Sequence, residues 1–475
     1  MNQEQIINLF IKGTWVRGEG SCLPVVDKYT GRPLGVLHEA SGNQVDAAID
    51  AARGAFVATR LEPHERCRIM DRVADAVTAA TAELTALIVA ESGVPWKDSA
   101  NEVARCAETF RLSAEEGRRL VGEMVPIQGA SGQAHRMAFT LRVPRGVVGG
   151  ISAFNSPLNM AAHKIAPALA SGNVVVFKPP ASTPMSATRL FELMLEAGVP
   201  PGHITLLQGD AEVGRTLVAH PGIDFLTFTG STPVGRSIRQ VRGLRPVALE
   251  LGSIAATIVC DDANLDRAVT RCTQSAFRRQ GQACTSTQRL FVQRGIIDAF
   301  TPRLVAAARA LVVGDPHDPQ TDVGPMISVQ EAERALAWVL EAIDEGAHCL
   351  SGGTLDGALL APTILTNVSP DMRVMREEIF APVLSIIPFD DLDVAIAEVN
   401  ATEFGLAVGL FTADMTRALN AASQLHVGVV HLNDASSSRV DLMPFAGVKD
   451  SGVGVEGPRY AMREMTEERL VTISL

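Results

Sequence analysis

Apolar residues recur with two different periods in the first third of the chain. From Gln44 onward they are spaced by three and four residues, which is the period of an amphipathic helix. The same spacing predicts a second helix over 63–87 and a third over about 97–121. Residues 7–32 favour short strands and turns. Residues 135–144 alternate between apolar and polar positions, as a strand with two different faces does.

Beyond residue 146, short apolar runs alternate with helical segments. The run at 174–177 is apolar throughout, which is typical of a parallel strand buried on both faces. The alternation predicts an open, mostly parallel, doubly wound α/β sheet. Strands are expected at 147–151, 174–177, 204–207, 224–229 and 247–252, with helices at 156–171 and 183–197.

A second α/β block is predicted to begin near Ile254. The chain then ends in a strand at 469–475, which can pair with a neighbouring subunit by strand addition. The alternating strand at 135–144 suits the same contact, so we expect a homodimer or homotetramer. Helices of the second block are expected at 265–277, 296–311 and 329–345, and strands at 256–259, 290–292 and 384–388.

Composition excludes one class of partner. A length of 475 residues allows two or three domains, and 47% hydrophobic residues can form large cores. The net charge of −11 argues against nucleic acid, because that binding depends on neutralising phosphates with Lys and Arg. A locally basic site for a small anionic substrate is compatible with this charge.

Targeting and metal signals are lacking in the sequence. The seven cysteines are scattered without a Cys-x-x-Cys pair, which indicates reduced thiols in a cytoplasmic protein. Residues 1–7 do not resemble an export signal, and no apolar run is long enough to span a bilayer. The spacing of the histidines indicates no metal site. We therefore expect a cytoplasmic protein that binds neither membrane nor metal.

Cys284 is the centre of the candidate chemistry. Gly281 and Gln282 precede it and a small polar run follows, so a substrate has room to reach the sulfur. Such a thiol can act as a nucleophile. A buried structural cysteine is the alternative, since free Cys is among the most buried residue types.

Two further residues have types suited to work beside a nucleophile. Asn155 follows a strand and opens a helix, where its amide can stabilise an oxyanion or simply cap the helix. Glu250 is an acid among apolar residues, and burial would raise its pKa to suit a general base. A structural carboxylate with a buried partner is the alternative for Glu250.

Two places have features of nucleotide binding. Lys178 ends an apolar strand, and α/β folds bind nucleotides at the carboxyl ends of their strands, although a surface lysine is the alternative. Residues 230–235 open a helix, where backbone N–H groups attract phosphate. Their Gly-Ser-x-x-x-Gly pattern differs from Gly-x-Gly-x-x-Gly, so this turn alone is weak support.

Taken together, the motifs resemble those of the aldehyde dehydrogenase superfamily. The resemblance covers nearly the whole chain and keeps the family order of motifs. It implies NAD(P)-dependent oxidation of an aldehyde to its carboxylic acid through a thioester. The matching segments are 154–159 (FNSPLN), 178–179 (KP), 230–235 (GSTPVG), 249–252 (LELG), 281–289 (GQACTSTQR), 377–383 (EEIFAPV) and 443–452 (MPFAGVKDSG).

The resemblance implies a catalytic set and a fold. Cys284 would attack the aldehyde, Asn155 and the Cys284 backbone N–H would hold the oxyanion, and Glu250 would activate the hydrolytic water. The fold class is α/β and aldehyde dehydrogenase-like. Its expected parts are a doubly wound Rossmann-type NAD(P)-binding domain (1–122 and 142–252), an α/β catalytic domain (253–432) and a small β oligomerisation element (123–141 and 433–475).

The resemblance also implies a cofactor site. Lys178 would contact the adenosine ribose, Glu378 would hold the nicotinamide ribose, and Phe380 would pack near the nicotinamide. Many NAD-preferring members carry Glu where this chain has Ala181, so we expect either NAD or NADP. The other residues assigned to this site are Ser152, Ala153, Phe154, Pro180, Gly214, Gly230, Ser231, Val234 and Leu251.

This chain departs from the family pattern at two other places. Ser253 follows Gly252 where the family usually has a second glycine, and Ala446 replaces a glycine of the last motif. The Ser253 departure concerns the loop after Glu250 and leaves the acid itself in place.

Two long segments look like the branch that contains phosphonoacetaldehyde and lactaldehyde dehydrogenases. Within them His163 and Arg439, and on an earlier helix Arg105, are candidates for holding a substrate anion, since arginine forks suit phosphonate. The plainer interpretations are a helix-surface histidine, a loop salt bridge and a solvated or salt-bridged arginine. Phosphonoacetaldehyde is the favoured substrate, with lactaldehyde or glyceraldehyde-type aldehydes as the alternative.

Two other functions have the same fold. A CoA-acylating dehydrogenase often lacks the base, so Glu250 counts against it. A non-catalytic binding or structural protein would not need Cys284, Asn155, Glu250 and Glu378 together.

Overall fold

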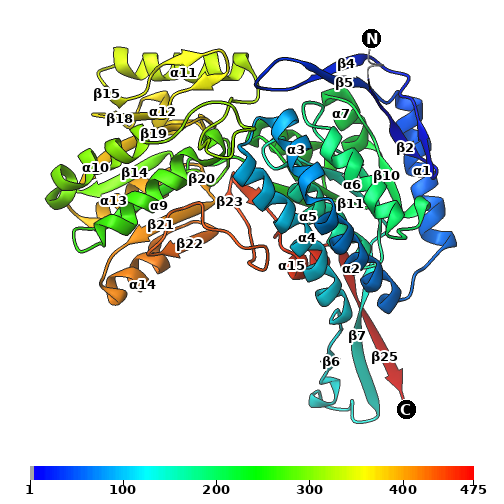
Figure 1. Cartoon of the computed structure of the whole chain (residues 1–475). Coiled ribbons are helices and arrows are strands. Elements are labelled where there is room, and N and C mark those ends of the chain that lie inside the picture. The colour runs from blue at the N-terminus through cyan, green and yellow to red at the C-terminus, as the bar shows by residue number, and fades with distance from the viewer. Residues whose placement is uncertain (1–4) are drawn as a thin grey trace.

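The computed structural model describes residues 5–475, which form two large sheets and a protruding small one (Figure 1). Residues 1–4 lie outside the described residues; they are part of the segment 1–7, which is predicted not to be an export signal. The chain starts in a three-stranded sheet of β1 (Ile6–Ile7), β5 (Pro33–His38) and β4 (Cys22–Val26). β2 (Leu9–Ile11) and β3 (Thr14–Val16) extend the edge of the first large sheet.

Four helices follow: α1 (Gly42–Ala58), α2 (Pro63–Ala79), α3 (Thr81–Ser92) and α4 (Trp96–Arg118). The single helix expected over 63–87 is wrong, because the chain bends by 72° between α2 and α3. The Thr78 and Thr81 hydroxyls bond to nearby backbone carbonyls at this point, in competition with the helix. The bend lets both helices bury apolar side chains in one core. Within residues 5–475, no single helix has the length and composition of a membrane span; only the bent α2–α3 pair does.

The first large sheet has eight strands in the order β24-β12-β11-β8-β9-β10-β2-β3. Its five central strands run parallel, so the predicted doubly wound sheet is confirmed. The strand order reverses between β8 and β11, and nucleotides bind at such switch points. The elements are β8 (Val147–Ile151), α5 (Pro157–Ala170), β9 (Val174–Lys178), α6 (Met185–Glu196), β10 (Ile204–Leu206), α7 (Ala211–Ala219), β11 (Phe225–Thr229), α8 (Thr232–Arg242) and β12 (Val247–Glu250).

The second large sheet has seven strands in the order β15-β18-β19-β14-β13-β21-β22, of which β15 is antiparallel. The helix predicted at 265–277 and the strand predicted at 256–259 have those bounds. The elements are β13 (Ala256–Val259), α9 (Leu265–Phe277), β14 (Arg289–Gln293), α10 (Ile297–Arg309), α11 (Val329–Asp344), β15 (His348–Ser351), β18 (Thr363–Thr366), α12 (Arg373–Arg376), β19 (Val383–Phe389), α13 (Leu392–Asn400), β21 (Ala407–Phe411), α14 (Met415–Gln424) and β22 (Val429–Leu432), with a small hairpin of β16 (Leu355–Asp356) and β17 (Leu359–Leu360).

The segment after β22 returns to the first sheet and helps to position the candidate site. β23 (Val448–Lys449) pairs with β20 (Phe404–Gly405), and β24 (Gly452–Val453) pairs with β12 beside Glu250. α15 (Pro458–Glu464) follows.

A three-stranded sheet extends away from the rest of the molecule (Figure 1). Its middle strand β7 (Arg136–Pro144) agrees with the alternating strand predicted at 135–144. β7 pairs with β6 (Met124–Val125) on one side and with β25 (Thr466–Ser474) on the other. The terminal strand therefore pairs within its own chain, and most of β25 is exposed at the sheet edge. The domain boundaries given above stay predictions.

Candidate active site

Cys284 lies in the loop between α9 and β14 and is partly exposed. The chain reaches it through Arg279, Gln280 and Gly281, which have φ of 53°, 57° and 66°. A left-handed conformation costs a non-glycine residue about 1–2 kcal/mol, so surrounding contacts must hold the first two residues.

Those contacts come from both halves of the molecule. Arg279 donates to the Glu102 carboxylate at 2.8 Å and to the Asn155 carbonyl at 2.5 Å. Gln280 donates to the Gly93 carbonyl at 2.6 Å. A Cβ atom on Gly281 would lie 2.1 Å from the Ala381 carbonyl oxygen, so only glycine fits there. The loop before Cys284 is thus fixed by α4, the β8–α5 turn and the segment before β19.

Asn155 is buried in the turn between β8 and α5, facing this loop. Its Nδ2 donates to the Gln282 carbonyl at 2.7 Å, and its Oδ1 has no hydrogen-bond partner within the described chain. Asn155 does not cap α5, because Glu102 accepts from the first backbone N–H groups of the helix, those of Leu158 and Asn159. The amide is therefore held beside the residues that precede Cys284.

Two carboxyl groups lie near the thiol. Burial, aided by the charges of Glu378 and Glu250 and opposed by Arg439, raises the pKa of Cys284 to about 12. The thiol is therefore protonated at neutral pH and needs a base. Burial likewise raises the pKa of Glu378 to about 7, and its carboxylate accepts from the Ser253 backbone N–H at 2.9 Å. Because that donor is the backbone, the Ser253 departure leaves this contact intact.

Glu250 ends β12 and is buried. Its Oε2 has no hydrogen-bond partner among residues 5–475. Burial raises the pKa of Glu250 well above its usual range, and the negative charge of Glu456 adds to that effect. A carboxyl group that holds its proton this strongly is a stronger base once ionised.

An ionic network extends behind Glu250. Glu456 bonds to Arg439 at 2.5 Å and lies 3.4 Å from Lys164 and 4.0 Å from His163. These cations hold the pKa of Glu456 well below its usual range, against the effect of burial. Asp441 continues the network through its Oδ1, which lies 2.9 Å from His163 and 2.7 Å from Arg105.

The three residues predicted to hold a substrate anion all belong to this network. His163 is buried, and burial lowers its pKa. Arg439 is paired with Glu456 and packs 4.0 Å from the centre of the Phe445 ring. Arg105 binds Asp441 through two nitrogens. Each of the three side chains has an anionic partner in the protein, and their substrate-binding roles stay predictions.

The predicted cofactor residues gather at the carboxyl edge of the first sheet. Lys178 ends β9, donates to the Pro179 carbonyl at 3.0 Å and has its pKa lowered to about 8 by burial, which Asp210 and Glu39 partly oppose. The Cα of Gly214 is open toward the Lys178 side chain, since a Cβ there would lie 3.5 Å from its Cε. Gly230 and Ser231 precede α8, and Val234 lies exposed in its first turn.

Orphaned hydroxyls show that this edge suits a dinucleotide. Ser152 follows β8, and Thr229 ends the adjacent strand β11. Both hydroxyl groups are buried and have no hydrogen-bond partner within the described chain. The N-terminus of α8 directs free N–H groups to the same edge, which favours phosphate. The residues present therefore fit NAD or NADP.

The remaining predicted cofactor residues lie on turns at the same edge or face it from the second sheet. Phe154 meets Phe380 edge to face at 5.8 Å, and Phe380 has a φ of 51°. Leu251 is buried after β12 against Gly235. Ala153 follows β8, and Pro180 and Ala181 follow Lys178.

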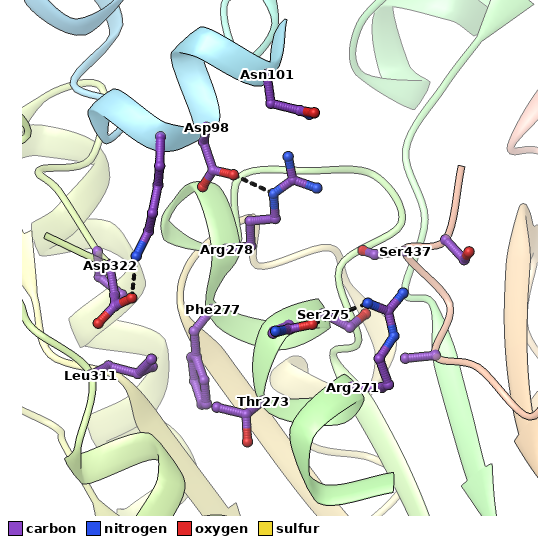
Figure 2. Close-up of a pocket in the computed structure, with 15 residues that line it drawn as sticks. Asp98, Asn101, Arg271, Thr273, Ser275, Phe277, Arg278, Leu311, Asp322 and Ser437 are labelled. Carbon is purple, nitrogen blue, oxygen red and sulfur yellow. Dashed lines mark hydrogen bonds and ion pairs between the residues drawn. The ribbon is translucent and has the colours of Figure 1, made fainter. Parts of the chain in front are cut away.

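A cavity of about 510 Å³ lies beside the nucleophile loop (Figure 2). α4, α9 and the loop after β22 line it. The loop reaches the active site through Ser437, whose hydroxyl donates to the Thr285 carbonyl at 3.0 Å. Arg271 and Arg278 line the cavity, with Lys97 at its outer wall. Asp98 and Asp322 also line the cavity and pair with Arg278 and Lys97, so the lining has three cations and two carboxylates.

Sequence reasoning missed four of the residues that organise the site: Glu102, Lys164, Glu456 and Arg279. Lys164 and Glu102 stand on helices at positions that are fully buried. A charged residue among apolar helical positions is a weak signal that a buried partner exists. Its partner cannot be identified from the sequence, because Lys164 and Glu456 are far apart along the chain.

No group of three or more His, Cys, Asp or Glu residues in the range 5–475 is arranged to hold a metal ion.

Comparison with known proteins defines the class. The aldehyde dehydrogenase family model matches residues 15–471. A 3-sulfolactaldehyde dehydrogenase of Priestia aryabhattai is 44% identical, and the match covers 100% of this chain and 99% of the relative. An aspartate-semialdehyde dehydrogenase of Pseudomonas canavaninivorans is 38% identical over 95% of this chain and 97% of its own.

Solved structures agree in the fold. The NADP-dependent glyceraldehyde-3-phosphate dehydrogenase of Bacillus halodurans, complexed with NADP, has a TM-score of 0.96 and 37% identity over 99% of this chain and 100% of its own. An NAD-dependent aldehyde dehydrogenase of Sinorhizobium meliloti has a TM-score of 0.95 and 34% identity over 99% and 95%. The predicted fold class is confirmed.

The chain belongs to the aldehyde dehydrogenase family. It is an oxidoreductase that acts on aldehydes and uses NAD or NADP, as the motifs predicted.

Proposed function

We propose that this enzyme oxidises a small aldehyde with an anionic group to the corresponding carboxylic acid. The observation that carries the proposal is the cavity lined by Arg271, Arg278 and Lys97 beside the Cys284 loop, in a chain of net charge −11. The similarity to a 3-sulfolactaldehyde dehydrogenase supports an anionic substrate. A sulfonated aldehyde and phosphonoacetaldehyde are both of this class.

In the proposed reaction, the Cys284 sulfur bonds to the aldehyde carbon as the carbonyl oxygen becomes an oxyanion. The thiol proton must leave first, because the thiolate is the nucleophile. Glu250 is the candidate acceptor, since its Oε2 has no partner within the described part of the chain and its charge affects the pKa of Cys284. Asn155 and the Cys284 backbone N–H stabilise the oxyanion.

NAD or NADP, when bound, would supply the hydride acceptor that oxidation of the carbon attached to sulfur requires. Lys178, the α8 N-terminus and Glu378 would hold the cofactor. Cys284 then carries the acyl group as a thioester. Glu250 first releases the thiol proton to solvent and then takes a proton from water; the resulting hydroxide attacks the thioester carbon, and the C–S bond breaks to give the acid and free thiolate.

The test is reduction of NAD and NADP by the purified enzyme with four aldehydes. These are 3-sulfolactaldehyde, phosphonoacetaldehyde, glyceraldehyde and propanal, with Cys284→Ala as the control. We expect kcat/KM for an anionic aldehyde to exceed that for both neutral ones. A preference for propanal or glyceraldehyde would overturn the anionic substrate class while leaving the reaction type unchanged.

CoA acylation is a different outcome of the same thioester. Glu250 favours water as the acceptor, because a base beside the thioester serves hydrolysis. Product analysis with and without CoA tests this: the free acid is expected in both cases, and an acyl-CoA product would contradict the assignment.

We further propose that the sheet of β6, β7 and β25 forms a homo-oligomer. β25 presents a free strand edge on which Leu470 and Ile473 are exposed. Light scattering should give a multiple of the chain mass, and truncation before Leu470 should lower it. A monomeric full-length protein would refute this. Cytoplasmic location also stays a prediction.

A further inference from the structure

A cluster of buried hydroxyl groups lies behind the turn that carries Cys284. Thr287 is at its centre, between Cys284 and β14. Its Oγ1 lies within hydrogen-bond distance of three other hydroxyl oxygens, those of Ser275 on α9 (2.7 Å), Thr257 on β13 (3.0 Å) and Ser436 after β22 (2.8 Å). All four side chains are buried. The cluster therefore joins α9, β13 and the loop after β22 to the segment that follows the nucleophile.

The direction of these hydrogen bonds is fixed by their last acceptor. A hydroxyl group has one proton to donate. Ser436 donates its proton to the Thr285 carbonyl at 2.8 Å, and a carbonyl can only accept. Ser436 must therefore accept from Thr287, which leaves Thr287 to accept from Ser275 and Thr257. Every proton in the chain of hydroxyls thus points toward the Thr285 carbonyl.

A second hydroxyl donates to the same carbonyl. Ser437, labelled in Figure 2, donates to the Thr285 carbonyl at 3.0 Å. Its only proton is used there, so the Thr285 hydroxyl donates to Ser437 at 3.3 Å. A carbonyl oxygen has two lone pairs, and both are occupied by hydroxyl donors. The peptide group that contains this carbonyl is therefore held in one orientation.

That peptide group is linked to the backbone N–H of Cys284. The Thr285 carbonyl belongs to the same peptide group as the Ser286 N–H, which donates to the Ala283 carbonyl at 2.9 Å. The Ala283 carbonyl in turn shares its peptide group with the Cys284 N–H, the candidate oxyanion donor. Because peptide groups are planar, two rigid units connect the hydroxyls to that N–H.

The same connection strengthens the donor. Hydrogen bonds in series polarise one another, and more so in a buried environment. Donation to the Thr285 carbonyl makes the Ser286 N–H a better donor, and its bond to the Ala283 carbonyl does the same for the Cys284 N–H. An oxyanion is stabilised most by donors that are already in place before it forms. The hydroxyl cluster supplies both the fixed orientation and the added polarity.

We propose that Thr287 is a positioning residue for the oxyanion site, which together with Ser436 orients and polarises the Cys284 backbone N–H. Thr287 acts through the backbone and has no contact with the substrate in this role. The inference rests on the proposed reaction, because it concerns the oxyanion that forms when Cys284 attacks the aldehyde. It does not depend on the charge of the substrate.

The test compares Thr287→Val, which removes the hydroxyl at nearly constant shape, with Thr287→Ser, which keeps it. The substrate is whichever of the four aldehydes the wild type oxidises fastest. We expect Thr287→Val to lower kcat and kcat/KM together by about 5- to 50-fold, less than the loss of a whole oxyanion donor. KM should stay within about twofold, because the interaction is made in the transition state. Thr287→Ser should restore most of the lost rate.

A matched control separates this role from ordinary stability. Thr85 on α3 is as buried as Thr287, each being 1% exposed, and its hydroxyl bonds to the Thr81 carbonyl at 2.7 Å. Thr85→Val should keep the wild-type kcat, with urea unfolding as the measure of stability for both valine variants. If Thr287→Val also keeps the wild-type kcat, the cluster only stabilises the fold and the proposal is overturned.

Alkylation distinguishes a weakened oxyanion donor from a displaced thiol. Iodoacetamide loses iodide at a saturated carbon and forms no oxyanion. Thr287→Val should therefore keep the wild-type alkylation rate of Cys284 within about twofold, since that rate follows the thiolate. Equal losses in alkylation and in kcat would show that the thiol itself has moved, which would overturn the proposal.

A second variant keeps the proposal testable if Thr287→Val folds poorly. Ser436→Ala removes one of the two donors to the Thr285 carbonyl and should lower kcat in the same way; an unchanged kcat would overturn the proposal. Cys284→Ala separates the two levels of the argument. If that variant stays active, the proposed reaction fails. If it is inactive while Thr287→Val and Ser436→Ala keep the wild-type kcat, only this inference fails.

Discussion

The side-chain amide of Asn155 donates a 2.7 Å hydrogen bond to the carbonyl of Gln282, which ties the first sheet to the loop that carries the nucleophile. The bond holds the amide beside the loop residues that precede Cys284, and we propose that it stabilises the oxyanion. We predict that Asn155→Ala lowers kcat about 10²- to 10³-fold, as loss of one oxyanion donor does in other enzymes. Steady-state kinetics measures this, with thermal unfolding as a check on folding. An unchanged kcat would show that the amide only holds the loop.

Glu250 should set the acidic limb of the pH profile. Its pKa is raised by burial, so the carboxylate that acts as base is present only above that raised pKa. Activity is therefore predicted to rise with pH and to fall as pH drops through a value well above that of an ordinary glutamate. Glu250→Gln should remove this limb and lower turnover about 10²- to 10⁴-fold. An unchanged limb in the variant would assign it to another group.

The Cys284 thiol should alkylate slowly in the free enzyme. Its pKa is raised to about 12, so the reactive thiolate is scarce at neutral pH. We predict that the iodoacetamide rate rises about tenfold per pH unit between about pH 7 and 9.5. Cys284→Ala supplies the background from the exposed Cys22 and Cys349. A rate that levels off near pH 7 would mean that the protein already stabilises the thiolate.

The Arg279–Glu102 pair should contribute to stability far more than an exposed pair. Its side chains are 8% and 0% exposed, and removing one partner of a buried pair costs about 3–5 kcal/mol. We predict that Arg279→Met lowers the urea midpoint by a corresponding amount and also lowers kcat, because Arg279 bonds to the Asn155 carbonyl. Arg215→Met, whose pair with Glu212 is 70% and 80% exposed, should cost less than about 1 kcal/mol. Similar midpoints for the two variants would contradict the prediction.

Sequence periodicity predicted the elements that have one clear pattern. The short β-favouring run at 256–259 and the amphipathic segment at 265–277 form β13 and α9 with those bounds. The break at Ala80 was missed because the residues on both sides favour helix, and the bend depends on packing. The sequence does not show whether His163 is buried or on the helix surface. α5 is buried on nearly all sides, so its apolar and polar positions do not mark a face exposed to solvent.

The candidate site was predictable where its residues lie in ordered motifs, as Cys284, Asn155 and Glu250 do. The charge network was not, because its members meet only after two sheets are packed together. Arg278 is a second example of bonding that the sequence does not predict. Nothing in the sequence distinguishes it from its neighbour Arg279. Yet Arg279 is buried with both terminal nitrogens bonded, whereas the terminal nitrogens of Arg278 have no partner among residues 5–475.

Gly281 allows a test that separates a steric clash from backbone strain. Gly281 and Gly243 both have positive φ, 66° and 54°, so alanine is strained at either position. A Cβ on Gly243 meets nothing within 4 Å, whereas a Cβ on Gly281 would lie 2.1 Å from the Ala381 carbonyl oxygen. Gly243→Ala should therefore lose stability through backbone strain alone and keep full activity. Gly281→Ala should lose more stability and at least about 10²-fold in kcat, since shifts near 1 Å in a reactive group have that effect. Urea midpoints and kcat for the pair decide it: if Gly281→Ala behaves like Gly243→Ala, the nucleophile loop can move away from Ala381, and its left-handed conformation is not what positions Cys284.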